Sequence, residues 1–351
     1  MKKIIFLTAL CLTVCIVSAN NYRDDDGRYK FEMKNTIEKT FSVDKNPLLD
    51  MNGKYSDFII TTWDQPQIDF KVNIVVKSDN EEKLKAKFNS ISILLEQSGN
   101  TVTAETVFGE YKYKSFNGSM TIKYYVHVPA DVAMDLQTKY GDIILDQANN
   151  KLDVEVKYGD FRADNITIDD TDKNNVDVKY GNINIDNVKK IEIVLDYGEA
   201  KINKCDYIDG TLKYSKIFIT DLDCGSIENK YSTTRIEKAN KIEFDNTAYS
   251  DMMVSHCTDK ITADIKYSDL SVSMTSDSPV VLIDCSYSDA VVHLNESASF
   301  KYSFDTSYCD ITFKGFFDTE TISRTGSRGD GQQGRIEVDA RYGDVKFYKN
   351  K

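Results

Sequence analysis

The stretch Lys139-Tyr140-Gly141-Asp142-Ile143, KYGDI, decides the fold because the chain repeats it. KYGDF follows at 157–161, KYGNI at 179–183 and RYGDV at 341–345. With the tyrosine as position 0, the series contains Tyr140, Tyr158, Tyr180, Tyr197, Tyr214, Tyr231, Tyr249, Tyr267, Tyr287, Tyr308 and Tyr342. The steps are 18, 22, 17, 17, 17, 18, 18, 20, 21 and 34, the last being twice 17. A period this regular indicates a solenoid.

Apolar residues alternate with variable ones on both sides of each tyrosine. Positions +3 and +5 are mainly apolar, as in Ile143 and Leu145, whereas position +4 is mixed and includes Lys201 and Arg235. Positions −4 and −2 are apolar as well, as in Val154 and Val156. Alternation of this kind is typical of a strand with one buried face.

Each repeat therefore consists of two short strands joined at a Tyr-Gly/Ser-Asp corner, with no helical pattern between them. Because strands without a crossover helix can pair in parallel only if the chain coils, the sequence predicts an all-β, single-stranded parallel β-helix of 17–22 residues per coil. Glycine at +1, as in Gly141, is expected to adopt backbone dihedral angles that a residue with a side chain resists, although serine replaces it in later repeats. Stacked coils should place tyrosine over tyrosine, with each ring at the inner edge of its corner.

Residues 1–19 read as a secretory signal peptide, with two lysines, an apolar run and Val17-Ser18-Ala19 as the cleavage site. Lipidation at Cys11 or Cys15 is the alternative, but Leu10 and Val14 precede them where a small residue is usual. The run is short for a transmembrane helix, and no later segment resembles one. The chain is therefore expected to be exported to the periplasm, the cell surface or the extracellular space.

The net charge is −12, and removal of the two leader lysines makes the remainder more acidic. Nucleic acid and anionic membrane surfaces both require a basic face, so neither is expected as a partner.

Residues 20–130 are organised differently and are expected to form a β-rich amino-terminal cap, with Pro129 near its junction to repeats at 131–351. NGKYSDFII already shows a corner at Tyr55, and strand-like runs occupy 68–76, 91–95, 101–107 and 121–128. Between them, Ser78 and Glu81 suggest the capping box of a short amphipathic helix. A cap is needed because an open solenoid end exposes unpaired strand edges.

The cysteines outside the leader number five, and three of them occupy packing columns. Cys205 and Cys257 stand at +8, and Cys285 stands at −2. We expect buried thiols rather than a disulfide framework, because Cys205 and Cys257 lie three coils apart.

An acidic stripe at +2 raises the question of a metal site. It contains Asp142, Asp160, Glu199, Asp251, Asp269, Asp289, Asp310 and Asp344. The calcium-binding nonapeptide pattern is absent, and lysines three residues before the stripe partly neutralise it, so a solvated corner is favoured over a calcium ladder.

Catalytic residues do not stand out from the repeat. The acids recur evenly, and the three histidines are His127, His256 and His293. Arg328-Gly329-Asp330, within the glycine-rich segment 324–334, matches a tripeptide read by some host adhesion receptors, but tripeptides arise easily by chance. The sequence predicts no catalytic, cofactor-binding or metal site and identifies no ligand-binding residues.

Five elements together resemble the bacterial putative-adhesin families of exported β-solenoids: the signal peptide, TTWDQPQIDFKV, YYVHVPADVAMDLQTKYGDI, the serial corners and the terminal ARYGDVKFYK. The related head GIN-type group is named for a Gly-Ile-Asn element that is absent here. The resemblance implies an envelope protein that presents a long β-surface to glycan or to an envelope or host protein, without catalysis or cofactor. The alternative is a carbohydrate-active β-helix enzyme, which a carboxylate cluster around a cleft, interrupting the even columns, would favour.

Overall fold

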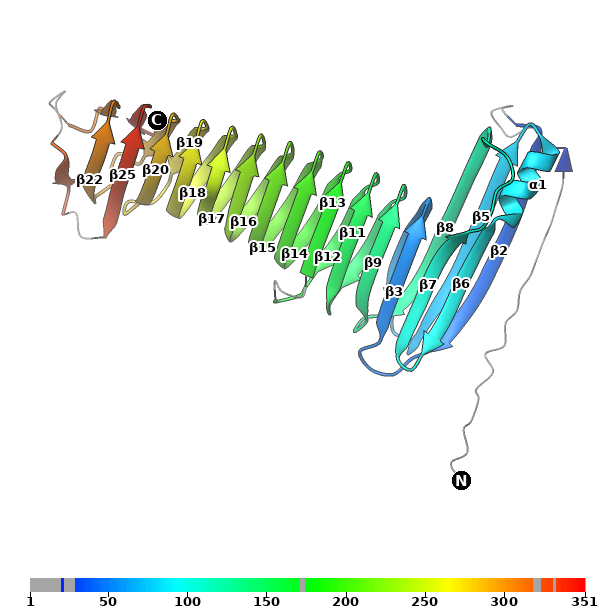
Figure 1. The fold of residues 1–351 in the computed structure, drawn as a ribbon. Helices are drawn as coiled ribbons and strands as arrows, with labels where there is room; N and C mark the ends of the chain where they lie inside the picture. The colour runs from blue at the N-terminus through cyan, green and yellow to red at the C-terminus, as the bar shows by residue number, and fades with distance from the viewer. Residues whose placement is uncertain (1–19, 22–28, 171–173, 318–322, 331–332, 351) are drawn as a thin grey trace. The chain divides into compact units, whose positions relative to one another are not determined.

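The computed structural model describes residues 20–21, 29–170, 174–317, 323–330 and 333–350. The predicted signal peptide, with Cys11 and Cys15, lies outside this range. Across the described residues the chain is all-β apart from one helix, and its strands belong to one large sheet (Figure 1). It divides into two compact units, Met1–Thr167 and Ile168–Lys351.

Unit 1 begins with antiparallel strands. β1 (Asn20–Asn21) pairs with β2 (Phe31–Ser42), β2 with β5 (Gln67–Ser78), and β5 with β8 (Gly118–Pro129), all antiparallel. β6 (Ile91–Ser98) and β7 (Thr101–Phe108) form a further antiparallel pair. These bounds confirm the four predicted strand-like runs.

The predicted helix is confirmed, but its predicted cap is wrong. Helix α1 spans Glu81–Asn89, and the side chain of Asn80 accepts the backbone N–H of Lys83 at 2.9 Å. Within this helix the side chain of Leu84 is buried. Asn80 displaces Ser78 as the cap because it directly precedes the first turn, where its oxygen reaches the free N–H groups.

Parallel pairing starts within unit 1, at Tyr55. β3 (Leu48–Lys54) precedes this tyrosine and pairs in parallel with β7 and with β9 (Ala133–Lys139). β4 (Ser56–Trp63) follows it and pairs in parallel with β8 and with β10 (Ile143–Ala148). β11 (Leu152–Lys157) then pairs with β9, and β12 (Phe161–Ile166) with β10.

In unit 2 each strand pairs in parallel with its copy in the next repeat. The strands are β13 (Asn174–Lys179), β14 (Ile183–Asp196), β15 (Glu199–Lys213), β16 (Lys216–Lys230), β17 (Thr233–Ala248) and β18 (Asp251–Lys266). Ile219 lies opposite Ile202 on one side and Ile236 on the other, which confirms the predicted register. Figure 1 shows these strands side by side.

The predicted apolar columns form the core. All residues at +5 are buried, and those at +3 are buried except Ile311. Lys201 is exposed as expected, whereas Arg235 is half-buried and forms an ion pair with Asp251 at 2.6 Å. Cys205, Cys257 and Cys285 are buried free thiols, as predicted, and burial raises the pKa of each to about 12.

The carboxyl end of unit 2 departs from simple succession. The remaining strands are β19 (Asp269–Met274), β20 (Val280–Ser286), β21 (Asp289–Leu294), β22 (Phe300–Ser307), β23 (Ile311–Lys314), β24 (Thr325–Arg328), β25 (Gly334–Arg341) and β26 (Val345–Lys349).

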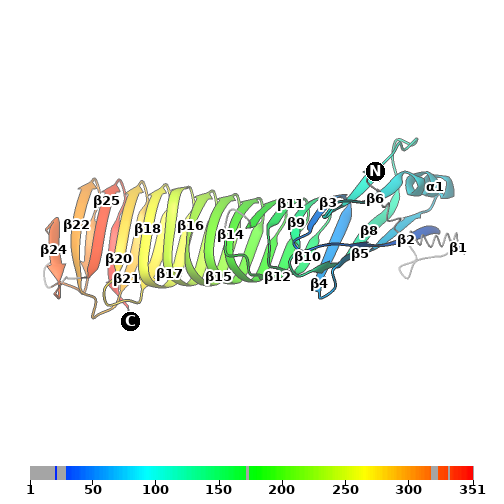
Figure 2. The same cartoon turned by 90° about the horizontal axis from the view of Figure 1, so that it is seen from below.

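The last repeat of the sequence is inserted between its two predecessors in space. β25 pairs with β20 on one side and β22 on the other, and β26 pairs with β21 and β23. β24 adds to the free side of β22 in the antiparallel direction. Figure 2 shows β25 between β20 and β22. The step of 34 therefore does not mark two repeats stacked in chain order, because the segment at 342 precedes the segment at 308 in the stack.

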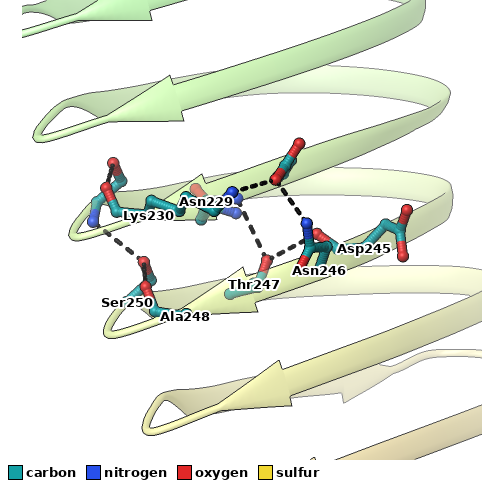
Figure 3. A network of polar contacts seen from close by, with 9 residues as sticks. Asn229, Lys230, Asp245, Asn246, Thr247, Ala248 and Ser250 are labelled. Atoms are coloured by element: carbon teal, nitrogen blue, oxygen red, sulfur yellow. Dashed lines mark hydrogen bonds and ion pairs between the residues drawn. The ribbon is translucent and has the colours of Figure 1, made fainter.

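One polar cluster interrupts the apolar core. Asn229, Thr234 and Thr247 are buried, and the Thr234 hydroxyl donates to Asn229 Oδ1 at 2.7 Å. A β-bulge in β17, where Asn246 has φ 46°, brings Thr247 Oγ1 within 3.3 Å of the Asn229 backbone N–H (Figure 3). The bulge thus provides an acceptor for a backbone donor that the irregular ladder would otherwise leave unpaired.

Candidate binding surfaces

Every corner tyrosine has a left-handed backbone. Its φ lies between 51° and 62° in all twelve corners, including Tyr55. The glycines after these tyrosines do not have positive φ. The expectation that glycine supplies the unusual conformation is therefore wrong, because tyrosine itself adopts it at a cost of about 1–3 kcal/mol.

Glycine is required at +1 for space. A β-carbon on Gly159 would lie 1.9 Å from the carbonyl oxygen of Gly141, and one on Gly198 would lie 1.8 Å from that of Gly181. In both cases the repeat beneath has Asp or Asn at +2, whose side-chain oxygen accepts the next +2 N–H. The corner carbonyl is left directed at the Cα above, so only glycine fits.

The serine corners at Ser215 and Ser232 use a different hydrogen-bond pattern. The carbonyl of Ser215 accepts the N–H of Thr233 at 2.9 Å, and that of Ser232 accepts the N–H of Asp251 at 3.1 Å. The Ser215 N–H in turn donates to Ser232 Oγ, which donates to the Lys230 carbonyl. Because the carbonyl now points along the stack, a β-carbon is tolerated.

The acidic stripe at +2 therefore has a structural role at both glycine and serine corners. Asp57, Asp142, Asp289 and Asp344 each accept a backbone N–H from the neighbouring repeat at 2.9–3.4 Å. Within the described residues, no group of three or more His, Cys, Asp or Glu side chains is placed to hold a metal ion.

The tyrosine rings stack into a ladder on the outside of the corner. In unit 1, Tyr55, Tyr140 and Tyr158 stack with centroids 4.9 and 5.0 Å apart. In unit 2 the ladder contains Tyr180, Tyr197, Tyr214, Tyr231, Tyr249, Tyr267, Tyr287, Tyr342 and Tyr308, with spacings of 4.7–5.1 Å. We refer to these twelve residues as the tyrosine ladder.

The expected inner position of the rings is wrong. The tyrosines are 39–52% exposed, and Tyr308, the last in its stack, is 83% exposed. The left-handed backbone directs the side chain away from the core at the point where strand alternation breaks. Each interior ring is covered on both faces by its neighbours, so it offers its edge and hydroxyl rather than a flat face.

A second surface lies at the carboxyl end of unit 2. Its outward positions −5 and −3 bound a groove of about 520 Å³ across strands β18, β20, β25 and β22. The −3 row consists of Asp264, Asp284, Asp339 and Asp305. We call this surface the acidic groove.

The histidines do not converge. His127 stacks on Trp63, His293 stacks on Tyr348, and His256 Nδ1 lies 3.2 Å from the carbonyl oxygen of Glu237. They occupy separate places in the described structure and do not assemble with paired carboxylates.

The Arg328-Gly329-Asp330 side chains contact their own chain. The Arg328 guanidinium donates to the carbonyls of Glu296 and Ala298, and Asp330 Oδ1 accepts the Ser299 hydroxyl at 2.6 Å. These contacts give the tripeptide a structural role in holding the end of β24 against the segment that precedes β22.

Comparisons with known proteins identify similar structures only. No family model matches the sequence, and no curated protein matches it. One solved structure to which the chain is similar is that of a putative cell adhesion protein from Clostridium sporogenes, with 11% sequence identity and a TM-score of 0.21. The match covers 90% of this chain and 100% of that one. The chain is also similar to a putative lipid binding protein from Parabacteroides distasonis, with 10% sequence identity and a TM-score of 0.35; the match covers 90% of this chain and 97% of that one. A third similar structure is a putative adhesin from Parabacteroides merdae, with 11% identity and a TM-score of 0.27; the match covers 90% of this chain and 96% of that one.

Proposed function

We propose that this chain is a non-catalytic, extracytoplasmic binding or scaffold protein. Its amino-terminal part, 20–130, would act as a cap after removal of 1–19, and its repeats at 131–351 would coil as a single-stranded parallel β-helix. The exposed face would bind a glycan or an envelope or host protein.

The observation that carries this proposal is the exposed tyrosine ladder. Twelve aromatic side chains, between 39% and 83% exposed, form regular rows within the two units. Exposed aromatic residues gathered on one surface are typical of recognition sites, because they supply large contact area at low entropic cost. The phenol hydroxyls add hydrogen-bonding groups at nearly constant spacing.

No observation favours the enzyme alternative. The carboxylates of the acidic groove all stand in one column of the repeat, rather than interrupting the columns.

Among the described residues, no helix is long and apolar enough to cross a bilayer.

The proposal is tested with a glycan array and with pull-downs from cell-envelope and host-surface extracts. Both experiments use a form of the protein that begins at residue 20. A ladder variant carries Tyr214→Asn, Tyr231→Asn and Tyr249→Asn, since asparagine tolerates the left-handed backbone. A control carries Phe218→Asn and Met253→Asn, which are exposed apolar side chains outside the ladder.

Binding that is lost in the ladder variant and kept in the control supports the proposal. No ligand in either screen, or equal binding by both variants, contradicts it. Circular dichroism of both variants verifies that the fold is retained.

A further inference from the structure

The acidic groove contains a row of four carboxylates whose order in space differs from their order in the chain. Asp264 lies opposite Asp284, Asp284 opposite Asp339, and Asp339 opposite Asp305. The insertion of β25 between β20 and β22 places Asp339 inside the row. Earlier repeats have both acidic and other residues at −3, namely Gln137, Glu155, Asp177, Val194, Thr211, Glu228 and Asn246.

These carboxylates lack the structural role of those at +2. In the described structure, Asp264, Asp284 and Asp305 take part in no side-chain hydrogen bond or ion pair, whereas Asp339 lies 3.6 Å from Arg341. Burial and the charges of Asp339 and Asp264 raise the pKa of Asp284. Like charges directly opposite one another destabilise neighbouring strands, and the Arg341 charge offsets this repulsion only in part.

The row borders a hollow that can hold a ligand. The outward −5 side chains Thr262, Leu282, Ser303 and Glu337 form its other wall. Glu337 is already paired with Arg335 through two contacts. The volume of about 520 Å³ lies within the usual range of ligand sites. Leu282 and Phe304 add apolar surface, which suits the aliphatic stem of a long basic side chain.

We propose that the acidic groove docks a linear basic segment of a protein partner, with lysine or arginine side chains along the aspartate row. Parallel strands are about 4.8 Å apart, so the four aspartates span about 14 Å. An extended peptide presents side chains on one face every ~6.8 Å. Two or three basic side chains on one face therefore match the length of the row.

This inference rests on the proposed binding function but uses a surface separate from the tyrosine ladder. The test of the acidic groove can therefore fail while the test of the tyrosine ladder succeeds, and the two failures can be told apart.

The test measures binding of fluorescein-labelled decalysine to the exported chain by fluorescence anisotropy, at low salt and at 0.5 M NaCl. The groove variant carries Asp264→Asn, Asp284→Asn and Asp305→Asn. The matched control carries Asp209→Asn, Asp221→Asn and Glu237→Gln, three exposed acids elsewhere in unit 2. Both variants change the net charge equally.

We expect wild-type binding that weakens with salt, at least a tenfold loss of affinity in the groove variant, and less than a twofold loss in the control. Equal losses would overturn the proposal in favour of non-specific attraction to an acidic protein. Absence of wild-type binding would overturn it as well. Competition by millimolar calcium at constant ionic strength, without competition by sodium, would assign the groove to a metal ion instead.

Discussion

Replacing Ile219 with aspartate should destabilise unit 2 strongly, whereas the same change at Phe218 should be tolerated. Ile219 is 2% exposed and lies between Ile202 and Ile236. Phe218, its neighbour in the chain, is 38% exposed on the outer face, opposite Lys201 and Arg235. The two variants carry the same new side chain in the same strand, so they differ mainly in the direction of that side chain.

The expected magnitude follows from the burial of Ile219. Loss of a fully buried isoleucine costs about 1.5–3 kcal/mol. Burial of a carboxyl group without a partner costs about 2 kcal/mol or more, even when the group is protonated. The free energy of unfolding should therefore fall by about 4 kcal/mol or more. Phe218→Asp should change it by about 0.5 kcal/mol, because the carboxylate remains solvated beside two basic side chains.

Urea denaturation, followed by circular dichroism and by tyrosine fluorescence, measures the difference. With a denaturant slope of about 3 kcal/mol/M, the midpoint of Ile219→Asp should fall by about 1.3 M. Hydrogen exchange should show that the loss extends to β15 and β17, because neighbouring repeats support one another. Equal midpoints for the two variants, or a lower midpoint for Phe218→Asp, would refute the assigned register.

Three further outcomes are expected. Gly159→Ala should destabilise the fold by several kcal/mol, because the new methyl group would lie 1.9 Å from the Gly141 carbonyl oxygen. Gly210→Ala is the control, because the nearest atom to its new methyl group lies 3.5 Å away. Equal shifts in the melting temperatures of the two variants would contradict the argument. Cys205 should resist alkylation at pH 8 until the chain unfolds, and dithiothreitol should leave the melting temperature unchanged; rapid native labelling would show that the thiol is accessible. Asp284→Asn should raise stability at pH 7 by about 0.2–1 kcal/mol. Because the folded-state pKa of Asp284 is raised, wild type gains stability as pH falls from that pKa towards 3.8, so the benefit of the substitution should shrink there; a constant benefit would argue against charge repulsion.

The strand positions and the buried columns could be predicted because both depend on local alternation. A side chain at +5 is two residues from one at +3, so the two share a face whatever the strand pairs with. The register followed because only one alignment keeps all apolar columns inside. The same reasoning placed Cys205, Cys257 and Cys285 in the core.

The corner chemistry could not be derived from the same pattern. The pattern predicts glycine as the residue with the unusual backbone, but Tyr140 and its equivalents have the positive φ. Whether +1 must be glycine depends on the hydrogen bond made by the repeat beneath, which is a contact between residues about 17–18 positions apart. Sequence reasoning also assigned the +2 acids to solvent, and missed their bonds to backbone N–H groups.

By itself the sequence determined the repeat, its register and its buried faces, because these follow from periodic alternation along the chain. The tertiary structure alone decided the order of the last repeats, since parallel strands of equal period can stack in either order with the same apolar columns. That order places Tyr342 between Tyr287 and Tyr308, and Asp339 between Asp284 and Asp305. The outward direction of the tyrosines was likewise decided by the left-handed corner, where strand alternation no longer applies.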